Sequence, residues 1–191
     1  MNHSDCKEIF SHELPATSLD PVVRARREDK IQVAMIALCG CWGCTLSFLD
    51  MDEALLRLLE KINITRSSLT DVKRIPHHCA IGFIEGGVAN SENIETLEHF
   101  RENCDIMISV GACAVWGGVP AMRNMVPLKD CLKEAYIESA TAVSGQKPAI
   151  PYHPDIPKIT SQVYPCHEVV KMDYFIPGCP PDGAVIPSGA S

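Results

Sequence analysis

The amino-acid sequence predicts an α/β domain built on a doubly wound parallel sheet. Three observations lead to this fold class: short apolar runs that end near glycine, segments of helical apolar spacing between them, and a length of 191 residues, enough for one hydrophobic core. Buried parallel strands consist of nearly continuous apolar residues, and their alternation with amphipathic helices is typical of this architecture. Two units are expected, a polar N-terminal arm over residues 1–30 and one α/β domain over residues 31–191.

The predicted elements follow one another from residue 31. The apolar run Ile31–Leu38 predicts the first strand, and leucines at helical spacing with acidic residues between them predict a helix over Thr45–Lys61. The remaining expected elements are strands at Ile81–Glu85, Asp105–Val110 and Asp173–Ile176, a helix from Asn90 or Ser91 to about Asn103, and a proline-rich loop from Pro120 to Val170 with some helix near Lys129–Ser139.

Composition and charge argue against several classes of protein. There are 17 Lys and Arg against 24 Asp and Glu, and a net charge of −7 argues against binding to nucleic-acid phosphates. The longest nearly apolar run, Val33–Leu46, contains three cysteines and two glycines and is shorter than the roughly 20 residues that a membrane span needs. The N-terminus shows neither a secretory apolar segment nor a twin-arginine signal. We therefore expect a cytoplasmic protein with no nucleic-acid or membrane partner.

The unusual feature of the composition is its ten cysteines. In a reducing compartment cysteines remain thiols or bind metal. Three predicted strands run into glycine-containing turns that hold cysteine, at residues 39–44, 111–120 and 177–181. Ligand sites in open α/β sheets form at the carboxyl ends of the strands, so these turns can bring four thiols together. The four candidates are Cys41, Cys44, Cys113 and Cys179.

Four thiolates suit an iron–sulfur cluster or a structural zinc ion. Zinc sites of this kind usually combine two local CxxC pairs, whereas here Cys41 and Cys44 form one pair and Cys113 and Cys179 are distant single cysteines. This arrangement favours an iron–sulfur cluster, because a cubane needs ligands that approach from several directions. A structural zinc-binding interaction protein stays as a remote alternative.

The sequence around these turns resembles the small subunit of nickel–iron hydrogenases over about residues 32–187. The resemblance rests on CWGCTLSFLDMDE at residues 41–53, IEG at 84–86, GACA at 111–114, GGVPA at 117–121 and PGCPP at 177–181. It implies a flavodoxin-like domain that binds one [4Fe–4S] cluster, the proximal cluster, beside a catalytic large subunit. The four ligands of the family fall on Cys41, Cys44, Cys113 and Cys179.

Departures from the family pattern indicate which members the chain is similar to. Periplasmic members carry a twin-arginine signal, a second domain with two further clusters, and a glutamate soon after the CxxC pair, where Thr45-Leu46-Ser47 stand here. The shorter form is similar to the cytoplasmic, bidirectional NAD-reducing hydrogenases. The related quinone-reductase subunit of respiratory complex I has adjacent cysteines in its first motif, whereas Trp42 and Gly43 separate the pair in this sequence.

The resemblance implies an electron-transfer subunit of a soluble NAD-reducing nickel–iron hydrogenase (H2 + NAD+ = H+ + NADH). The nickel–iron site would lie on the large subunit, and diaphorase subunits with flavin and iron–sulfur clusters would accept the electrons, so no catalytic residue is expected on this chain. FMN is expected in a partner, because cluster cysteines occupy the loop after the first strand where a flavin phosphate would bind. The alternative is the small subunit of another cytoplasmic hydrogenase that uses a deazaflavin or other acceptor.

The other notable residues have simpler interpretations. Cys39 is expected to point to the other face of the strand end and not to bind the cluster. Glu85 either carries protons or bonds to the amides of a ligand turn. Trp42 and Trp116 either shield the cluster or face the large subunit, or they make only ordinary packing contacts. Core positions or free thiols are expected at Cys6, Cys79, Cys104, Cys131 and Cys166, and a surface turn at His77-His78.

Overall fold

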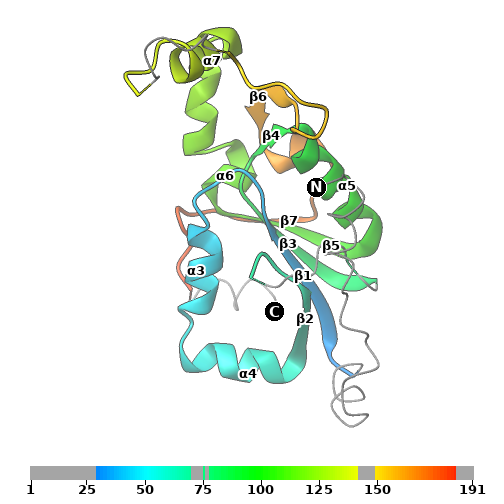
Figure 1. Ribbon diagram of the computed structural model, residues 1–191. Helices are drawn as coiled ribbons and strands as arrows, with labels where there is room; N and C mark the ends of the chain where they lie inside the picture. Colours follow the sequence, from blue (N-terminus) through cyan, green and yellow to red (C-terminus); the bar gives the residue numbers. More distant parts are fainter. Residues whose placement is uncertain (1–28, 70–74, 76–77, 142–148, 184–191) are drawn as a thin grey trace, which may run out of the picture.

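A parallel sheet of five strands forms the centre of the protein (Figure 1). The computed structural model describes residues 29–69, 75, 78–141 and 149–183. The sheet strands, in spatial order, are β2 (Ile62–Arg66), β1 (Ile31–Ala37), β3 (Cys79–Glu85), β5 (Cys104–Val110) and β7 (Tyr174–Ile176). Counted along the chain, these sheet strands have the order 2-1-3-4-5 of flavodoxin-like folds. The predicted doubly wound parallel sheet is therefore confirmed.

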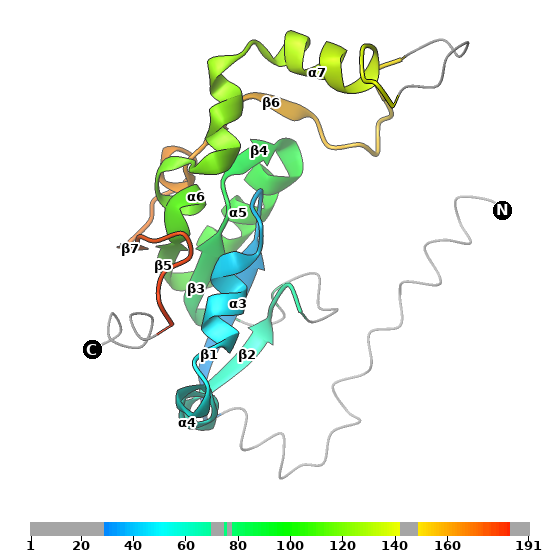
Figure 2. The ribbon, with the colours of Figure 1, turned by 90° about the vertical axis from the view of Figure 1, so that its left-hand side faces the viewer.

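Helices cover both faces of the sheet (Figures 1 and 2). Helices α3 (Gly43–Leu49) and α4 (Glu53–Lys61) follow β1, and α5 (Ser91–Asn103) and α6 (Gly111–Trp116) flank β5. Successive residues of a strand point to opposite faces, and β1 accordingly contributes to two separate core clusters. One cluster contains Val33, Met35, Phe48, Met51 and Ile62, and the other contains Ala34, Ile84, Leu97, Phe100, Met107 and Ala114.

The predicted helix Thr45–Lys61 is wrong in one respect, because it is two helices. The chain bends at residues 50–52, where Asp52 adopts φ 50° and ψ −127°. Figure 1 shows α4 lying across the end of α3. Met51, at the bend, is buried in the same core cluster as Phe48 of α3. Apolar spacing continues through both helices, so periodicity alone does not reveal the bend.

Strand β2 is absent from the sequence-based prediction. Its polar residues interrupt the apolar run by which a buried strand is recognised, and its last residue, Arg66, is buried. The guanidinium of Arg66 lies 4.8 Å from the centre of the Phe100 ring, which gives the charged group an aromatic surface to pack on. The other four strands begin and end within two residues of their predicted positions, and the Asn90 side chain caps α5 as expected.

The predicted loop over residues 120–170 is more ordered than its prolines indicate. It contains most of the 3-10 helix η2 (Val119–Met125), helix α7 (Leu128–Tyr136), strand β6 (Ile159–Tyr164) and the 3-10 helix η3 (Cys166–Glu168). Strand β6 pairs antiparallel with β4 (Val88–Asn90), a partner about seventy residues earlier that no local pattern discloses. Figure 2 shows α7 and β6 beyond the end of the main sheet. The helix expected near Lys129–Ser139 is confirmed as α7.

Two further points concern the chain as a whole. Residues 1–28 lie outside the described residues, so the N-terminal arm and the domain boundary after residue 30 stay predictions. Across the described ranges, none of the helices has the length and apolar character needed to cross a membrane.

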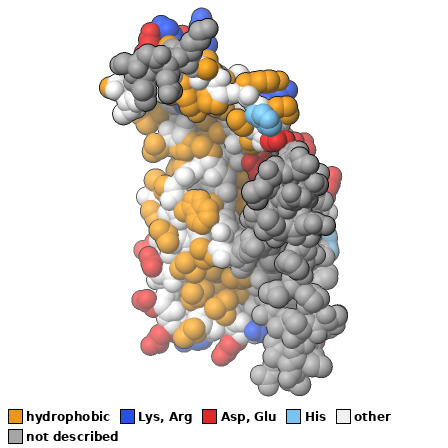
Figure 3. Space-filling model, in the orientation of Figure 1, with side chains coloured by type: hydrophobic (Ala, Val, Ile, Leu, Met, Phe, Trp, Pro, Cys, Tyr) orange, Lys and Arg blue, Asp and Glu red, His pale blue; other side chains and the backbone are white. Residues whose placement is uncertain are grey.

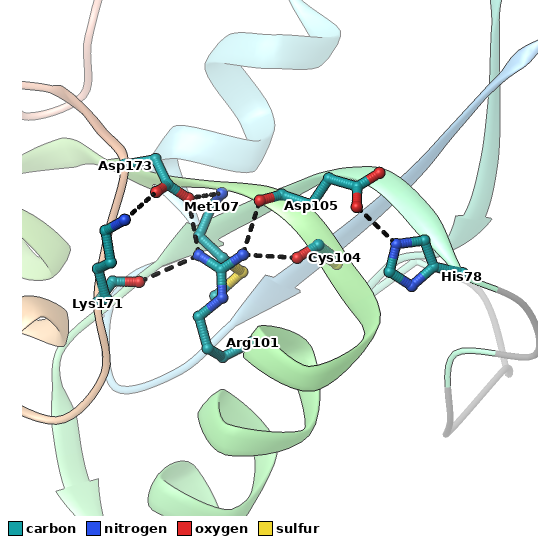
Figure 4. A network of polar contacts seen from close by, with 7 residues as sticks. All are labelled: His78, Arg101, Cys104, Asp105, Met107, Lys171 and Asp173. Atoms are coloured by element: carbon teal, nitrogen blue, oxygen red, sulfur yellow. Dashed lines mark hydrogen bonds and ion pairs between the residues drawn. The ribbon is translucent and has the colours of Figure 1, made fainter.

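Arg101 joins the end of α5 to β5 and to the residue before β7 (Figure 4). Its guanidinium donates to the Asp173 carboxylate at 2.7 Å and to the carbonyls of Cys104 and Asp105 at 2.6 and 2.7 Å. The same Asp173 oxygen accepts the Met107 backbone N–H at 2.9 Å. The hydrogen bond from Arg101, followed by the one from Met107, lowers the pKa of Asp173 below its ordinary value of 3.8.

We expect Asp173→Asn to destabilise the fold by about 1–2 kcal/mol at neutral pH, because it removes the negative charge that pairs with the Arg101 guanidinium. The pKa of Asp173 is lower in the folded protein, so its carboxylate stabilises the fold above 3.8 and this contribution is lost as the pH falls through the lowered pKa. Urea unfolding followed by circular dichroism should show a gap between variant and wild type that shrinks below that pH. Asp155→Asn, in an exposed pair with His153, is the matched control. A gap that stays constant in acid would contradict this prediction.

Candidate metal centre

The carboxyl ends of four sheet strands are in register with one another, which brings the cysteine turns to the same end of the sheet. Ala37 of β1 pairs with Glu85 of β3, Glu85 with Val110 of β5, and Val110 with Ile176 of β7. The turns that follow β1, β5 and β7 therefore leave the same end of the sheet, with the end of β3 between those of β1 and β5. The β1/β3 junction is also where the strand order reverses, the position at which open α/β sheets form ligand sites.

Backbone contacts tie these turns to one another. The Ala112 amide donates to the Gly178 carbonyl at 2.7 Å, which joins the turn after β5 to the turn after β7. The Ser47 hydroxyl donates to the Pro181 carbonyl, which joins α3 to the segment beyond Cys179. Sequence patterns missed this role of Ser47, because its partner lies 134 residues away.

The four predicted thiols lie within electrostatic reach of one another. Burial, then the charge of Glu85 and a hydrogen bond to it, and then the charges of Cys113 and Cys41, raise the pKa of Cys44 to about 12. Burial and then the charges of Cys179 and Cys41 raise the pKa of Cys113. Thiols that disfavour one another's ionisation become good ligands once a bound cation supplies the opposite charge.

Glycines leave room for the ligand turns to approach one another. Gly111 has φ +84°, and a Cβ atom there would lie 2.3 Å from the Cys44 sulfur. Gly118 has φ +52°, and a Cβ atom there would lie 3.0 Å from the Cys113 sulfur. Gly111 therefore lets the turn after β5 approach Cys44, and Gly118 lets the same turn fold back against its own Cys113. Both positions require glycine for conformation and for space. This close backbone approach to sulfur is what an iron–sulfur site needs, since backbone N–H groups near the sulfurs tune its potential.

Nowhere in the described ranges do three His, Cys, Asp or Glu side chains form a group that would hold a single metal ion. Cys41 and Cys179 are exposed and Cys44 and Cys113 are half-buried, so the site lies at the surface.

Glu85 adopts the second of its two expected roles, a carboxylate bonded to the amides of a ligand turn. It is 6% exposed. One of its oxygens accepts the backbone N–H groups of Cys44 and Thr45 at 3.0 and 3.2 Å, and the other accepts the Thr45 hydroxyl. The side chain thus bridges the end of β3 and the start of α3. No sequence signal identified Thr45 as its partner.

The tryptophans beside the ligand turns do not pack in the core. Trp42 is 42% exposed and Trp116 is 57% exposed, so neither residue is buried in the core. Hydrophobic side chains gather over α3 and around α6 and α7 on the face shown in Figure 3. The exposed apolar residues of α3 and η2 include Leu46, Leu49, Val119, Met122 and Met125.

The remaining cysteines and histidines largely follow expectation. Cys79, Cys104 and Cys166 are buried, as predicted for core positions, and Cys131 is half-buried. Cys39 is half-buried and forms a β-bridge with Gly87, and its charge contributes to raising the pKa of Cys113. His78 is exposed and pairs with Asp105 at 2.8 Å, which confirms a surface position. Cys6 and His77 lie outside the described residues.

Fold and site together define a class: flavodoxin-like α/β domains with cysteine turns from several strands at the switch-point edge. The chain belongs to the family described as "NADH ubiquinone oxidoreductase, 20 Kd subunit", which it matches over residues 41–190. It is 76% identical to the NAD-reducing hydrogenase HoxS subunit delta of Cupriavidus necator, an alignment that covers 96% of this chain and 87% of the relative.

Two further comparisons agree with this assignment. A crystal structure of NAD+-reducing [NiFe]-hydrogenase in the H2-reduced state contains a chain 42% identical, with a TM-score of 0.78 and coverage of 82% of this chain and 86% of that chain. A subunit of the F420-non-reducing hydrogenase of Methanothermobacter marburgensis is 40% identical over 80% of this chain, which spans 50% of that relative. The predicted resemblance to nickel–iron hydrogenase small subunits is confirmed.

Proposed function

We propose that this chain is the electron-transfer small subunit of a soluble NAD-reducing nickel–iron hydrogenase, and that Cys41, Cys44, Cys113 and Cys179 bind one [4Fe–4S] cluster. The observation that carries the proposal is the meeting of three cysteine turns at the switch-point edge of the sheet. The 76% identity to HoxS subunit delta supports the particular reaction, H2 + NAD+ = H+ + NADH. The nickel–iron site would then lie on a large-subunit partner.

The residues of this chain would act by holding and orienting the thiolates. When bound, the cluster supplies a one-electron carrier between a hydrogen-splitting site and a flavin-containing diaphorase module. Gly111 lets the turn after β5 approach Cys44, Gly118 lets that turn fold back against Cys113, and Glu85 ties the first turn to the sheet. The exposed Trp42 and Trp116 offer apolar surface for the large subunit beside the ligand turns. We assign none of these side chains a role as a nucleophile or as a general acid or base.

The similarity of the chain to two kinds of relative indicates which electron acceptor the proposal should name. The relative named as NAD-reducing shares 76% of its residues with the chain over 87% of its own length. The relative from Methanothermobacter marburgensis named as F420-non-reducing shares 40%, and the chain spans about half of it. The difference supports the NAD-reducing hydrogenase over a hydrogenase with another acceptor. Cytoplasmic location and the placing of FMN in a partner stay predictions.

Isolation of the chain with its natural partners tests the proposed function. Affinity purification from its own cells, followed by mass spectrometry, should recover a nickel-containing large subunit and flavin-containing diaphorase subunits. The complex should be brown from iron–sulfur absorption and should form NADH from NAD+ under hydrogen. A colourless preparation with zinc as its metal, or a complex without a nickel subunit, would contradict the proposal.

A further inference from the structure

We propose that Glu85 is a positioning residue that holds the first ligand turn and lowers the reduction potential of the cluster through its negative charge. The inference rests on the proposed function, because it assigns Glu85 a role toward the group that Cys44 would bind. It adds a residue of β3 to a site whose four proposed ligands all come from other elements.

The geometry of Glu85 fits an ionised carboxylate. The backbone N–H groups of Cys44 and Thr45 and the Thr45 hydroxyl all donate to its two oxygens. A deprotonated carboxylate only accepts hydrogen bonds, so an arrangement in which three donors point at its two oxygens matches that state. Hydrogen bonds to an ionised acceptor are also stronger than neutral ones. The turn that carries Cys44 is therefore held to the end of β3.

The charge of Glu85 acts in an apolar environment. Its neighbours around a small cavity of about 20 Å³ include Met35, Phe48, Phe83 and Val110, and no Lys, Arg or His lines this cavity in the described structure. Water and counter-ions screen such a buried charge only weakly. The Glu85 carboxylate accepts the backbone N–H of Cys44 at 3.0 Å, so its charge lies beside a proposed ligand. A negative charge beside the ligand disfavours the added electron and lowers the reduction potential.

Two substitutions separate positioning from charge. Glu85→Gln removes the charge but retains an oxygen for the two amides, and the Thr45 hydroxyl can turn to accept from the new amide group. Glu85→Ala removes the charge and every acceptor that holds the turn. Glu95→Gln, on the exposed side of α5, changes the net charge equally and is the matched control. Each variant would be isolated as the complete complex.

Iron content and the potential found by a redox titration followed by electron paramagnetic resonance provide the readouts. We expect Glu85→Gln to keep its iron and to shift the cluster potential upward, whereas Glu95→Gln shifts nothing. We expect Glu85→Ala to lower the affinity of the site for its iron about 10- to 100-fold, so that the isolated complex contains less iron. An unchanged potential in Glu85→Gln, with wild-type iron content, would overturn this inference alone. A wild-type chain without cysteine-bound iron would overturn the proposed function as well.

Discussion

Cys113→Ser is expected to abolish hydrogen-dependent NAD+ reduction by the complex, a loss of about 100-fold or more. Cys113 lies in α6, directly beyond the end of β5, and the charges of Cys179 and Cys41 raise the pKa of its thiol. A serine hydroxyl is a harder and more weakly ionised ligand than a thiol, so the iron it faces is poorly held. Iron and labile sulfide should fall in the variant. Diaphorase activity with an artificial dye should persist, because it needs only the flavin module.

Cys131→Ser is the matched control for this experiment. Cys131 is half-buried in α7, outside the three ligand turns, so its substitution should leave iron content and turnover unchanged. Survival of both the cluster and turnover in Cys113→Ser would show that the ligand set is wrong. Cys39 would then be the next thiol to test, because its charge also reaches Cys113.

Gly111→Ala should disrupt the site almost as severely without removing a thiol. Its φ of +84° costs an L-residue about 1–2 kcal/mol, and the added Cβ atom would lie 2.3 Å from the Cys44 sulfur. Either Cys44 or the turn after β5 must move. Cys44 is a proposed ligand, and the turn after β5 contains another, Cys113. We expect iron content and hydrogen-dependent NAD+ reduction to fall together, by about 10-fold or more, as for a displaced metal ligand.

The control for Gly111→Ala is the reverse substitution, alanine to glycine, at a position outside the ligand turns. Ala135→Gly lies on the exposed face of α7 and should lower helix stability by about 1 kcal/mol without any effect on iron. Iron analysis and activity assays on both complexes make the comparison. Full iron content in Gly111→Ala would show that the turn relaxes at little cost and would contradict the role given to this glycine.

Most of the sheet could be predicted because its strands are buried on both faces. The runs that became β1, β3 and β5 are apolar enough to be recognised without any knowledge of their neighbours. Prediction failed where stability comes from distant partners. Strand β2 carries Arg66, whose burial depends on Phe100 of α5, and β6 is ordered by pairing with β4. Such contacts leave no periodic signal in the local sequence.

The candidate thiols could be chosen from sequence because they follow strand ends, and parallel strands end at a common edge. Their supporting residues could not be chosen in this way. Glu85 had two open interpretations, and only its burial against the amides of Cys44 and Thr45 decided between them. Ser47 acquires its role from Pro181, which the fold places against α3.

Local pattern and family resemblance were thus sufficient for the fold class, the family and four candidate thiols, because strand-end turns and their cysteines are written in short contiguous motifs. Only the tertiary structure decided how these motifs are held: the level strand ends, the hydrogen bonds of Glu85, the bend between α3 and α4, and the exposure of Trp42 and Trp116. The physical reason is that these properties depend on groups far apart in sequence, which meet only when the sheet has assembled.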